Sequence, residues 1–374
     1  MRVALVHDWL TGMRGGERCL EVFCELFPAA DLYTLLHVPG SVSPPIERRR
    51  IVTSFIQWLP GARDRYRSYL PLFPAAVRRF DLSGYDLVLS SSHAVAKGVR
   101  VPPGALHVCY CFTPMRYVWD LYAQYFGPAA GAGPLTRAAM PAVAAWLRRW
   151  DRRTAAGVHH FVAISSFIAE RIGRAYGRVA DVIHPPVDVA RFRPDGSAGD
   201  YYLVVSALTP YKRVDLAVEA ATRLGRRLVV VGTGPEAERL RARAGPTVQF
   251  RGWQDDAAVA DLLAGCRALL FPPVEDFGIA PLEAMASGRP VIAYGAGGAL
   301  ETVVPPGAGA PPTGLLFVPQ TADALAGAMV RLESGAIDFA PRALRRRAEA
   351  FDRPLFRDRV DRYLSGRLAE YRGC

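Results

Sequence analysis

Asparagine is absent from the 374-residue sequence, and lysine occurs only twice, at Lys97 and Lys212, beside 44 arginines. Without asparagine the chain has no acceptor site for N-linked glycans. Its most apolar stretch, Ala138 to Leu147, is about half as long as a membrane-spanning helix. The first residues lack the apolar segment of a signal peptide. We therefore expect a cytoplasmic protein that is neither secreted nor integral to a membrane.

Paired cysteines and metal-binding motifs are also missing. No two of the six cysteines are spaced as Cys-x-x-Cys, which is typical of reduced core cysteines in a cytosolic protein. There is no Asp-x-Asp motif and no histidine cluster, so no metal site is expected. The cysteines are Cys19, Cys24, Cys109, Cys111, Cys266 and Cys374.

Positive charge is concentrated in the first half of the chain. Residues 1–187 carry a net charge of +9 and residues 188–374 only +2, with most of the excess in Arg48–Arg79 and Arg137–Arg153. Both stretches interleave arginine with aromatic and leucine side chains, which favours contact with an anionic surface such as the inner face of the plasma membrane. The alternative is a solvated face in an arginine-rich composition. No DNA- or RNA-binding motif is present, so nucleic acid is not an expected partner.

Short β-branched runs alternate with amphipathic helices along most of the chain, more regularly in its second half. Repeated βα units predict parallel sheets that are covered by helices on both faces, an α/β fold. Strands are predicted at residues 3–7, 32–36, 87–89, 106–111, 161–165, 202–205, 227–231, 248–252, 268–271, 291–293 and 315–318. Helices are predicted at residues 16–27, 166–176, 213–224, 236–244, 256–266, 281–286, 321–333 and from 341 onwards.

The proline-rich segment from Ile183 to Gly196 is interpreted as a linker between two domains. We expect a Rossmann-like domain over residues 1–185 and a second over residues 186–354. A final helix, residues 355–374, is expected to pack back on the first domain. Two such domains facing each other would place a ligand cleft at the carboxyl ends of their strands.

Two glutamates, Glu275 and Glu283, bracket the start of a predicted helix. Pro281 suits the first turn of that helix, so Glu283 is expected within the same turn. Backbone N–H groups around Gly278 to Ala280 would then form a helix N-terminus that attracts phosphate. Carboxylates repel phosphate but accept hydrogen bonds from sugar hydroxyls. The layout therefore predicts binding of a nucleotide diphosphate sugar.

The segment Glu275 to Glu283, followed by Ala-Met-Ala-Ser-Gly-Arg-Pro-Val-Ile-Ala, resembles a motif of the family 4 retaining glycosyltransferases, which have the GT-B fold. The resemblance extends over nearly the whole chain and is strongest to the branch of O-antigen mannosyltransferases. The other segments that carry it are Val6 to Arg18, Ser90 to Gly98, Thr113 to Asp120, His184 to Asp188 and Pro210 to Asp215.

The resemblance implies a role for each motif residue. Glu275 would contact hydroxyls of the transferred hexose, and Glu283 the ribose. Lys212, which we favour over Lys97 as a site that needs a compact ammonium, would bind the diphosphate and stabilise the leaving group. Glu275, Lys212 and His93 form the implied catalytic set. Donor binding is also assigned to Gly15, Gly16, Ala207, Arg213, Gly232, Gly234, Phe277, Gly278, Ile279 and Ala280, and acceptor binding to Arg116, Tyr117, Trp119 and Asp120.

Two positions depart from the family pattern. Members usually carry an arginine a few residues before the motif lysine, where this chain has Ser206-Ala207-Leu208, and we expect Arg213 to take its place. A histidine is common before the segment that begins at Thr113, where this chain has Phe112. Either His93 supplies the ring nitrogen near the reacting sugar, or the substrate differs.

The implied reaction transfers mannose from GDP-mannose, with retention of the α configuration and without a metal ion or other cofactor. The implied acceptor is a polyprenyl-diphosphate-linked glycan in O-antigen or exopolysaccharide synthesis. One alternative is the same reaction with a UDP-sugar. Another, from a different class, is an NAD-dependent oxidoreductase, because Gly232-Thr-Gly234 begins a G-x-G-x-x-A pattern with Asp255 some 20 residues on. Against it, this loop follows the second strand of its domain, whereas the fingerprint normally follows the first.

Overall fold

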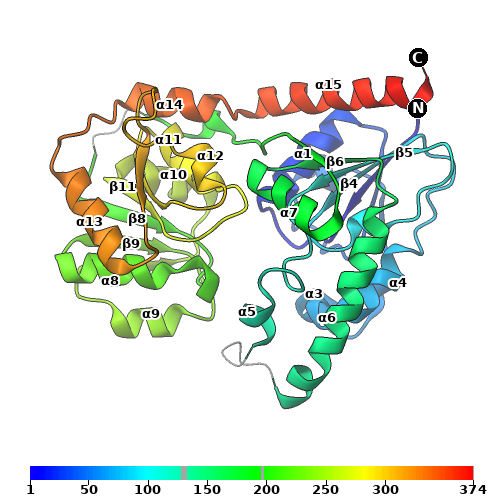
Figure 1. The fold of residues 1–374 in the computed structure, drawn as a ribbon, viewed down its shortest axis with the longest axis horizontal. Helices are drawn as coiled ribbons and strands as arrows, with labels where there is room; N and C mark the ends of the chain where they lie inside the picture. The colour runs from blue at the N-terminus through cyan, green and yellow to red at the C-terminus, as the bar shows by residue number, and fades with distance from the viewer. Residues whose placement is uncertain (128–132, 195–197, 374) are drawn as a thin grey trace. The chain divides into compact units, whose positions relative to one another are not determined.

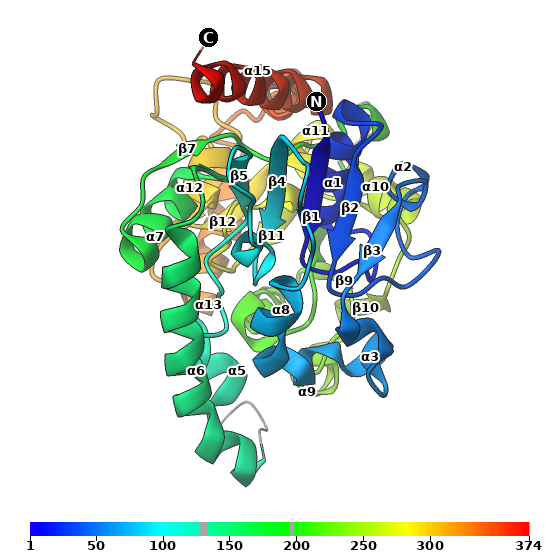
Figure 2. The same ribbon diagram turned by 90° about the vertical axis from the view of Figure 1, so that its right-hand side faces the viewer.

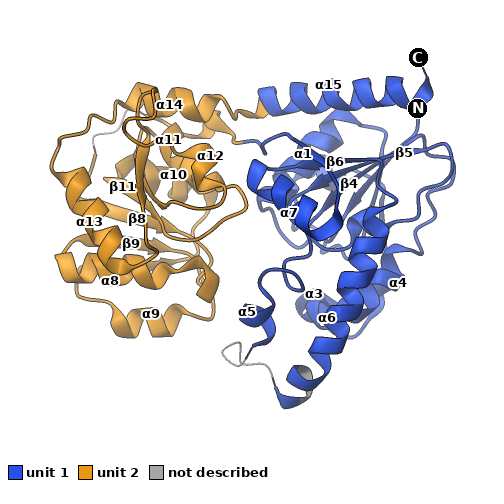
Figure 3. Ribbon diagram, in the orientation of Figure 1, with its two compact units in different colours: residues 1–186, 354–374 blue, residues 187–353 orange. Residues whose placement is uncertain are grey.

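The computed structural model describes residues 1–127, 133–194 and 198–373. The chain divides into two compact units, unit 1 (Met1–Pro186 with Pro354–Cys374) and unit 2 (Val187–Arg353) (Figure 3). Residues 195 and 196 of the predicted linker lie outside the described residues, as do Ser197 and Cys374. The other five cysteines are free and buried, which confirms the prediction for them. In the described part of the chain, no helix combines the length and the apolar character needed to cross a bilayer.

Unit 1 is built on a seven-stranded parallel sheet in the order β3-β2-β1-β4-β5-β6-β7 (Figures 1 and 2). Its centre is fully buried, with Leu5 paired with Leu32 on one side and with Leu89 on the other. Near-continuous apolar runs of this kind are expected where helices cover both faces of a sheet. The strands are β1 (Val3–His7), β2 (Asp31–Thr34), β3 (Ile51–Thr53), β4 (Leu87–Ser92), β5 (Leu106–Cys111), β6 (His160–Ala163) and β7 (Ala180–Val182).

The helices of unit 1 include several short ones between residues 44 and 77 that the sequence did not predict. Prolines and arginines interrupt the apolar periodicity there, so no helical face extends over more than a turn or two. The helices are α1 (Gly15–Leu26), α2 (Pro44–Glu47), η1 (Phe55–Trp58), α3 (Ala62–Arg65), η2 (Tyr66–Leu72), α4 (Phe73–Val77), η3 (Ala96–Gly98), α5 (Tyr122–Phe126), α6 (Pro134–Ala155), α7 (Ser166–Tyr176) and α15 (Arg353–Arg372).

The last helix, α15, belongs to unit 1 although the whole of unit 2 precedes it in the chain. Its Phe356 is buried and lies 5.9 Å from the ring of Phe23 in α1 and 5.7 Å from the ring of Tyr110 in β5, measured between ring centroids. The helical tail predicted from residue 341 is in fact two helices, because α14 ends at Glu349 and α15 begins at Arg353.

Unit 2 has a six-stranded parallel sheet in the order β10-β9-β8-β11-β12-β13. Its core packs apolar side chains of the sheet against α8 and α13. The strands are β8 (Tyr201–Val205), β9 (Arg227–Val231), β10 (Val248–Gly252), β11 (Ala268–Phe271), β12 (Val291–Tyr294) and β13 (Gly314–Phe317). The helices are η5 (Val189–Arg191), η6 (Pro210–Lys212), α8 (Val214–Leu224), α9 (Ala237–Arg243), α10 (Asp256–Gly265), α11 (Ile279–Ala286), α12 (Ala299–Thr302), α13 (Ala322–Glu333) and α14 (Pro341–Glu349).

Candidate active site

The sheet of unit 2 brings Lys212 and Glu275 together. From β8 the chain continues to β9 and β10 on one side of the sheet, and from β11 it continues to β12 and β13 on the other side. The strand order therefore reverses between the neighbouring strands β8 and β11. Ligands of open α/β sheets bind at the carboxyl ends of the strands at such a point. Lys212 follows β8 and Glu275 follows β11, and the ammonium forms an ion pair with the carboxylate. The side chains are only 19% and 14% exposed.

Two glycines hold the loop that carries Glu275. Gly297 pairs with Glu275 in an isolated parallel bridge, and the N–H of Gly298 donates to the Glu275 carbonyl at 2.8 Å. A Cβ at Gly298 would lie 2.2 Å from Cα of Phe277, and a Cβ at Gly297 would lie 2.5 Å from the Glu275 carbonyl oxygen. Only glycine allows this approach, so the loop is fixed by backbone contacts before any ligand binds.

Helix α11 begins two residues earlier than predicted. Gly278 is its N-cap at φ 95°, a conformation that favours glycine, and the helix starts at Ile279. Pro281 is therefore the third residue of the helix, where its missing N–H removes no intrahelical bond. Glu283 is the fifth residue, so the prediction that it lies in the first turn was wrong. The N–H groups of Ile279 and Ala280 still belong to the first turn, close in sequence to Glu275.

Arg213 and Ala207 occupy the loop after β8. Arg213 is the one non-glycine residue with positive φ (51°) in the described part of the chain, directly after Lys212. Its guanidinium donates to Asp215 at 3.2 Å and to Gln320 at 3.3 Å. Ala207 is exposed and offers no charge. The Arg213 guanidinium, next to Lys212 in the chain, is thus held in place by Asp215 and Gln320.

The loop Gly232-Thr-Gly234, on which the NAD-dependent alternative is based, needs its glycines for close packing. Gly232 and Gly234 have φ values of 128° and 158°. A Cβ at Gly232 would lie 1.9 Å from the Ser206 carbonyl oxygen, and one at Gly234 would lie 2.3 Å from that of Leu208. The loop follows β9, which is not the first strand of the unit. Both glycines are therefore explained by contact with the segment that leads to Lys212, with no dinucleotide required.

Unit 1 has a second polar cluster at its own reversal of strand order, between β1 and β4. Asp8 follows β1 and is fully buried. Its carboxylate accepts four backbone N–H groups after β4, at 2.7–2.9 Å. The donors belong to His93, Ala94, Val95 and Ala96. This arrangement fixes the turn that carries the predicted catalytic residue His93.

His93 is held as a neutral ring. Its Nδ1 lies 3.2 Å from Asp8 Oδ2, and its ring meets Trp9 edge-on with centroids 4.4 Å apart. Burial lowers the pKa of His93 to about 4, despite the opposing charge of Asp8. A neutral imidazole can donate or accept a hydrogen bond at neutral pH, which suits contact with a sugar hydroxyl.

His7 and Glu17 complete this cluster. His7 Nδ1 lies 2.8 Å from Ser91 Oγ, and its Nε2 lies 3.8 Å from Glu17 Oε1. Burial alone would raise the pKa of Glu17, but the neighbouring His7 ring lowers it below its ordinary value. The buried pair stands directly beside the turn of His93, since the rings of His7 and His93 are 6.4 Å apart.

Gly15 and Gly16 are the first two residues of α1. A Cβ at Gly16 would lie 3.4 Å from the ring of Phe112 and 3.6 Å from His7 Cε1, which are ordinary van der Waals distances, so Gly16 packs beside both rings. Phe112, which stands where relatives often have histidine, lies 6.3 Å from His93 between ring centroids. The aromatic residue therefore occupies the same cluster without supplying a polar atom.

The predicted acceptor residues follow β5 and are tied into the interior of unit 1. Trp119 Nε1 donates to Asp151 Oδ2 at 2.8 Å, and Asp120 accepts from Arg171 Nε at 3.0 Å. The half-buried ring of Tyr117 meets that of Tyr125 edge-on at 5.5 Å between centroids. Arg116 is half-buried at the start of the same turn.

Lys97, the second of the two lysines, has a structural role in unit 1. Its ammonium is 1% exposed and donates to Asp151 Oδ1 at 2.5 Å and to Thr154 Oγ1 at 3.3 Å. The other carboxylate oxygen of Asp151 accepts from Trp119 and from the Tyr176 hydroxyl, both at 2.8 Å. Lys97 thus reaches the acceptor residues only through Asp151.

Sequence reasoning missed three elements of these clusters. Asp8 lay inside a matching motif but was not singled out, although a carboxylate at the end of a buried strand is a signal. Asp151 is the lone acid among the five arginines of Arg137–Arg153. Gly297 and Gly298 close a glycine-rich run directly after a strand. Within the described residues, no group of three His, Cys, Asp or Glu side chains is placed to hold a metal ion.

Family models match both parts of the chain. The model described as glycosyltransferase family 4 matches residues 13–191, and the model described as glycosyl transferases group 1 matches residues 199–334. A GDP-mannose-dependent phosphatidylinositol monomannoside mannosyltransferase of Mycobacterium tuberculosis is 38% identical over 41% of this chain and 48% of its own length. A 2-deoxystreptamine glucosyltransferase of Streptomyces kanamyceticus is 31% identical over 66% of each chain. The chain spans about half the length of the curated mannosyltransferases it matches.

Solved structures share the fold at low sequence identity. Sucrose-phosphate synthase from Thermosynechococcus elongatus aligns with a TM-score of 0.73 and 19% identity, over 99% of this chain and 100% of that one. Anabaena HepE in complex with UDP aligns with a TM-score of 0.69 and 16% identity, over 98% and 100%. With two family models that together match most of the chain, and this fold around the two polar clusters, the protein belongs to the family 4 glycosyltransferases of the GT-B fold.

Proposed function

We propose that this protein is a retaining hexosyltransferase that moves mannose from GDP-mannose onto a polyprenyl-diphosphate-linked glycan in bacterial surface polysaccharide assembly. The observation that carries the transferase site is the Lys212–Glu275 ion pair at the reversal of strand order in unit 2. GDP-mannose is favoured because the named mannosyltransferase relatives depend on it. The lipid-linked acceptor rests on the resemblance to O-antigen mannosyltransferases.

The proposed chemistry places a cation where negative charge develops. When the bond between the anomeric carbon and the diphosphate breaks, the Lys212 ammonium and the N-terminus of α11 stabilise the departing diphosphate. Glu275 must then exchange its ion pair for hydrogen bonds to hexose hydroxyls. An acceptor hydroxyl, bound by unit 1, forms the new bond to the anomeric carbon on the same face, and its proton passes to the departing diphosphate. The proposal includes no metal ion or other cofactor.

The basic surface of unit 1 supports a membrane-bound acceptor. Trp58 in η1 is 83% exposed and Leu72 in η2 is 41% exposed, within the predicted stretch Arg48–Arg79. Trp146 on α6 is exposed within Arg137–Arg153. Each basic residue near an anionic surface contributes about 1 kcal/mol, and salt screens it. Vesicle binding should therefore fall steeply with added salt, and indifference to salt would overturn this part.

A thermal-shift panel tests the donor. The ligands are GDP, UDP, ADP, GDP-mannose, UDP-glucose and NAD, each with and without Mg²⁺. A ligand at 100 times its Kd stabilises the folded state by about 2.7 kcal/mol, which is readily measured. A response to GDP and GDP-mannose without metal supports the proposal. A response to UDP ligands alone would mean that the donor is a UDP-sugar and not GDP-mannose. A response to NAD alone would overturn the transferase site.

A UDP-sugar donor is the second candidate, because the 31% identical relative is named a glucosyltransferase. Variants of the site test where the donor binds, whichever nucleotide it carries. Lys212→Gln and Glu275→Gln should abolish the response to whichever nucleotide sugar binds. Arg251→Gln and Glu238→Gln, which change exposed charges elsewhere in unit 2, are the matched controls and should keep it. Equal responses in all four variants would overturn the site.

A further inference from the structure

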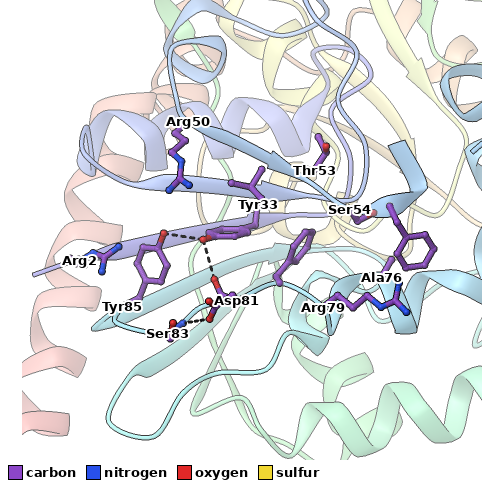
Figure 4. A pocket seen from close by; sticks show the side chains of 13 residues that line it. Arg2, Tyr33, Arg50, Thr53, Ser54, Ala76, Arg79, Asp81, Ser83 and Tyr85 are labelled. Carbon is purple, nitrogen blue, oxygen red and sulfur yellow. Dashed lines mark hydrogen bonds between the residues drawn. The ribbon is translucent and has the colours of Figure 1, made fainter. Parts of the chain in front are cut away.

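Unit 1 contains a cavity of about 560 Å³ at the outer edge of its sheet, beside the edge strand β3 (Figure 4). This volume is within the range of roughly 300–1,000 Å³ that is usual for small-molecule sites. Two strands, β2 and β1, separate β3 from the reversal of strand order, so the cavity is distinct from the cluster around His93. Residues from β2, β3, η1 and α4 line it, together with the segments before β1, after α4 and before β4.

The floor of the cavity is aromatic and held in place. Tyr33, Phe80 and Tyr85 are 6–8% exposed, and Tyr33 meets Phe80 edge-on at 5.3 Å between centroids. The Tyr33 hydroxyl lies 3.0 Å from that of Tyr85 and donates to the Asp81 carbonyl at 3.1 Å. Buried rings with satisfied hydroxyls form a surface that exists before a ligand arrives.

The walls of the cavity carry more positive than negative charge. Three arginines line it, against one carboxylate, Asp81. Figure 4 shows Arg2 and Arg50 at one end and Arg79 at the other, with Asp81 beside Ser83 on the side of Arg2. Arg50 is paired with Asp31 at 3.4 Å.

At the other end, the Arg79 side chain lies against an aromatic ring. The Arg79 guanidinium lies 4.9 Å from the ring centroid of Phe55, and within the described residues it takes part in no ion pair. A cation that rests against a ring while its donors stay unused is suited to binding an anion.

We propose that this cavity binds a phosphate ester, with the phosphate on Arg79 and the ring or apolar remainder on Phe55, Phe80 and Tyr33. Arginine binds phosphate through two parallel N–H donors, and the aromatic floor offers dispersion contact to the remainder. Such an ester is either the headgroup of an anionic lipid or a free phosphate ester. The inference does not depend on the proposed donor site, because that site is in unit 2.

The chain provides a matched control for the test. Arg78 is exposed and precedes Arg79, but it does not line the cavity. Arg79→Gln and Arg78→Gln therefore remove the same charge from adjacent positions. One arm measures phenyl phosphate, with inorganic phosphate for comparison, by ligand-detected NMR titration. The other measures co-sedimentation with phosphatidylglycerol vesicles, with phosphatidylcholine vesicles as the blank. Both arms include Lys212→Gln.

We expect Arg79→Gln to weaken binding about ten-fold or more, the effect of one lost charged hydrogen-bond pair, and Arg78→Gln to change it less than two-fold. A larger loss of phenyl phosphate binding in Arg79→Gln than in Arg78→Gln identifies the ligand as a free ester. A larger loss in Arg79→Gln that is seen only with the vesicles identifies it as a lipid headgroup. Equal effects of the two variants in both arms would overturn the site. Loss of phenyl phosphate binding in Lys212→Gln but not in Arg79→Gln would place the phosphate elsewhere and also overturn it. The nucleotide response of Arg79→Gln should stay unchanged.

Discussion

Replacement of Lys97 by methionine should destabilise unit 1 strongly. The Lys97 ammonium and the Asp151 carboxylate are 1% and 0% exposed, so the variant leaves a buried carboxylate without its cation. Removal of one partner from a buried pair costs about 3–5 kcal/mol. Asp151 keeps its hydrogen bonds from Trp119 and Tyr176, which partly replace solvation. We therefore expect the lower end of the range, about 3 kcal/mol.

The double variant Lys97→Met with Asp151→Asn tests the reasoning. The asparagine removes the unpaired charge but can still accept a hydrogen bond from Trp119, so the double variant should lose less stability than Lys97→Met alone. Arg100→Met, at an exposed position three residues away, is the control and should change stability by less than about 0.5 kcal/mol.

Urea unfolding followed by circular dichroism and tryptophan fluorescence measures these free energies. Because the ion pair lies within unit 1, the shift should be confined to the transition of that unit. A loss below about 1 kcal/mol for Lys97→Met, or a loss in the double variant at least as large as in Lys97→Met alone, would show that the pair is not the buried charge interaction described above.

Other predictions follow from the two polar clusters and from the buried histidines. Gly298→Ala should displace Phe277 and the loop of Glu275, and so lower nucleotide-sugar affinity in the thermal-shift panel, while circular dichroism stays native. Glu275→Gln should lower the rate of sugar transfer by about 10²–10³ in a radiolabelled-donor assay, and a smaller effect would contradict its role. Burial lowers the pKa of His93 to about 4, and it lowers to about 3 the pKa of His107, a buried residue of β5 whose Nε2 lies 2.9 Å from Ser90 Oγ. Protonation of either ring therefore favours the unfolded state. Stability should be full above about pH 6.5 and fall by about 1.4 kcal/mol per histidine for each pH unit between about pH 6.5 and the pKa of that histidine in the folded state, with a shallower fall in His107→Gln.

Much of the fold could be predicted because a buried parallel strand corresponds to a short run of apolar residues in the sequence. The predicted strands at residues 3–7, 106–111, 227–231, 248–252 and 268–271 are confirmed to the residue. The missed strands β3 and β7 are three residues long and partly exposed, so they leave no apolar run to detect. The start of α11 was misplaced because Gly278 adopts a positive φ as the N-cap, which periodicity does not reveal.

The candidate sites were predictable where one residue type carries the chemistry. Lys212 stood out in an arginine-rich composition, and Glu275 stood out within its motif. Asp8 could not be assigned, because its role comes from four N–H groups that lie 85–88 residues away in the sequence. The cavity beside β3 was also beyond sequence reasoning, since it is formed where a short edge strand and short helices meet.

The late position of α15 affects the order in which the chain can fold during synthesis. Phe23 and Tyr110 are translated early, but Phe356, which covers them, follows all of unit 2. At about 5–20 residues per second, the ribosome takes roughly 8–33 seconds to make unit 2. During that interval the apolar surface of unit 1 that α15 covers stays open to solvent, so unit 2 can complete its fold while unit 1 still awaits its last helix.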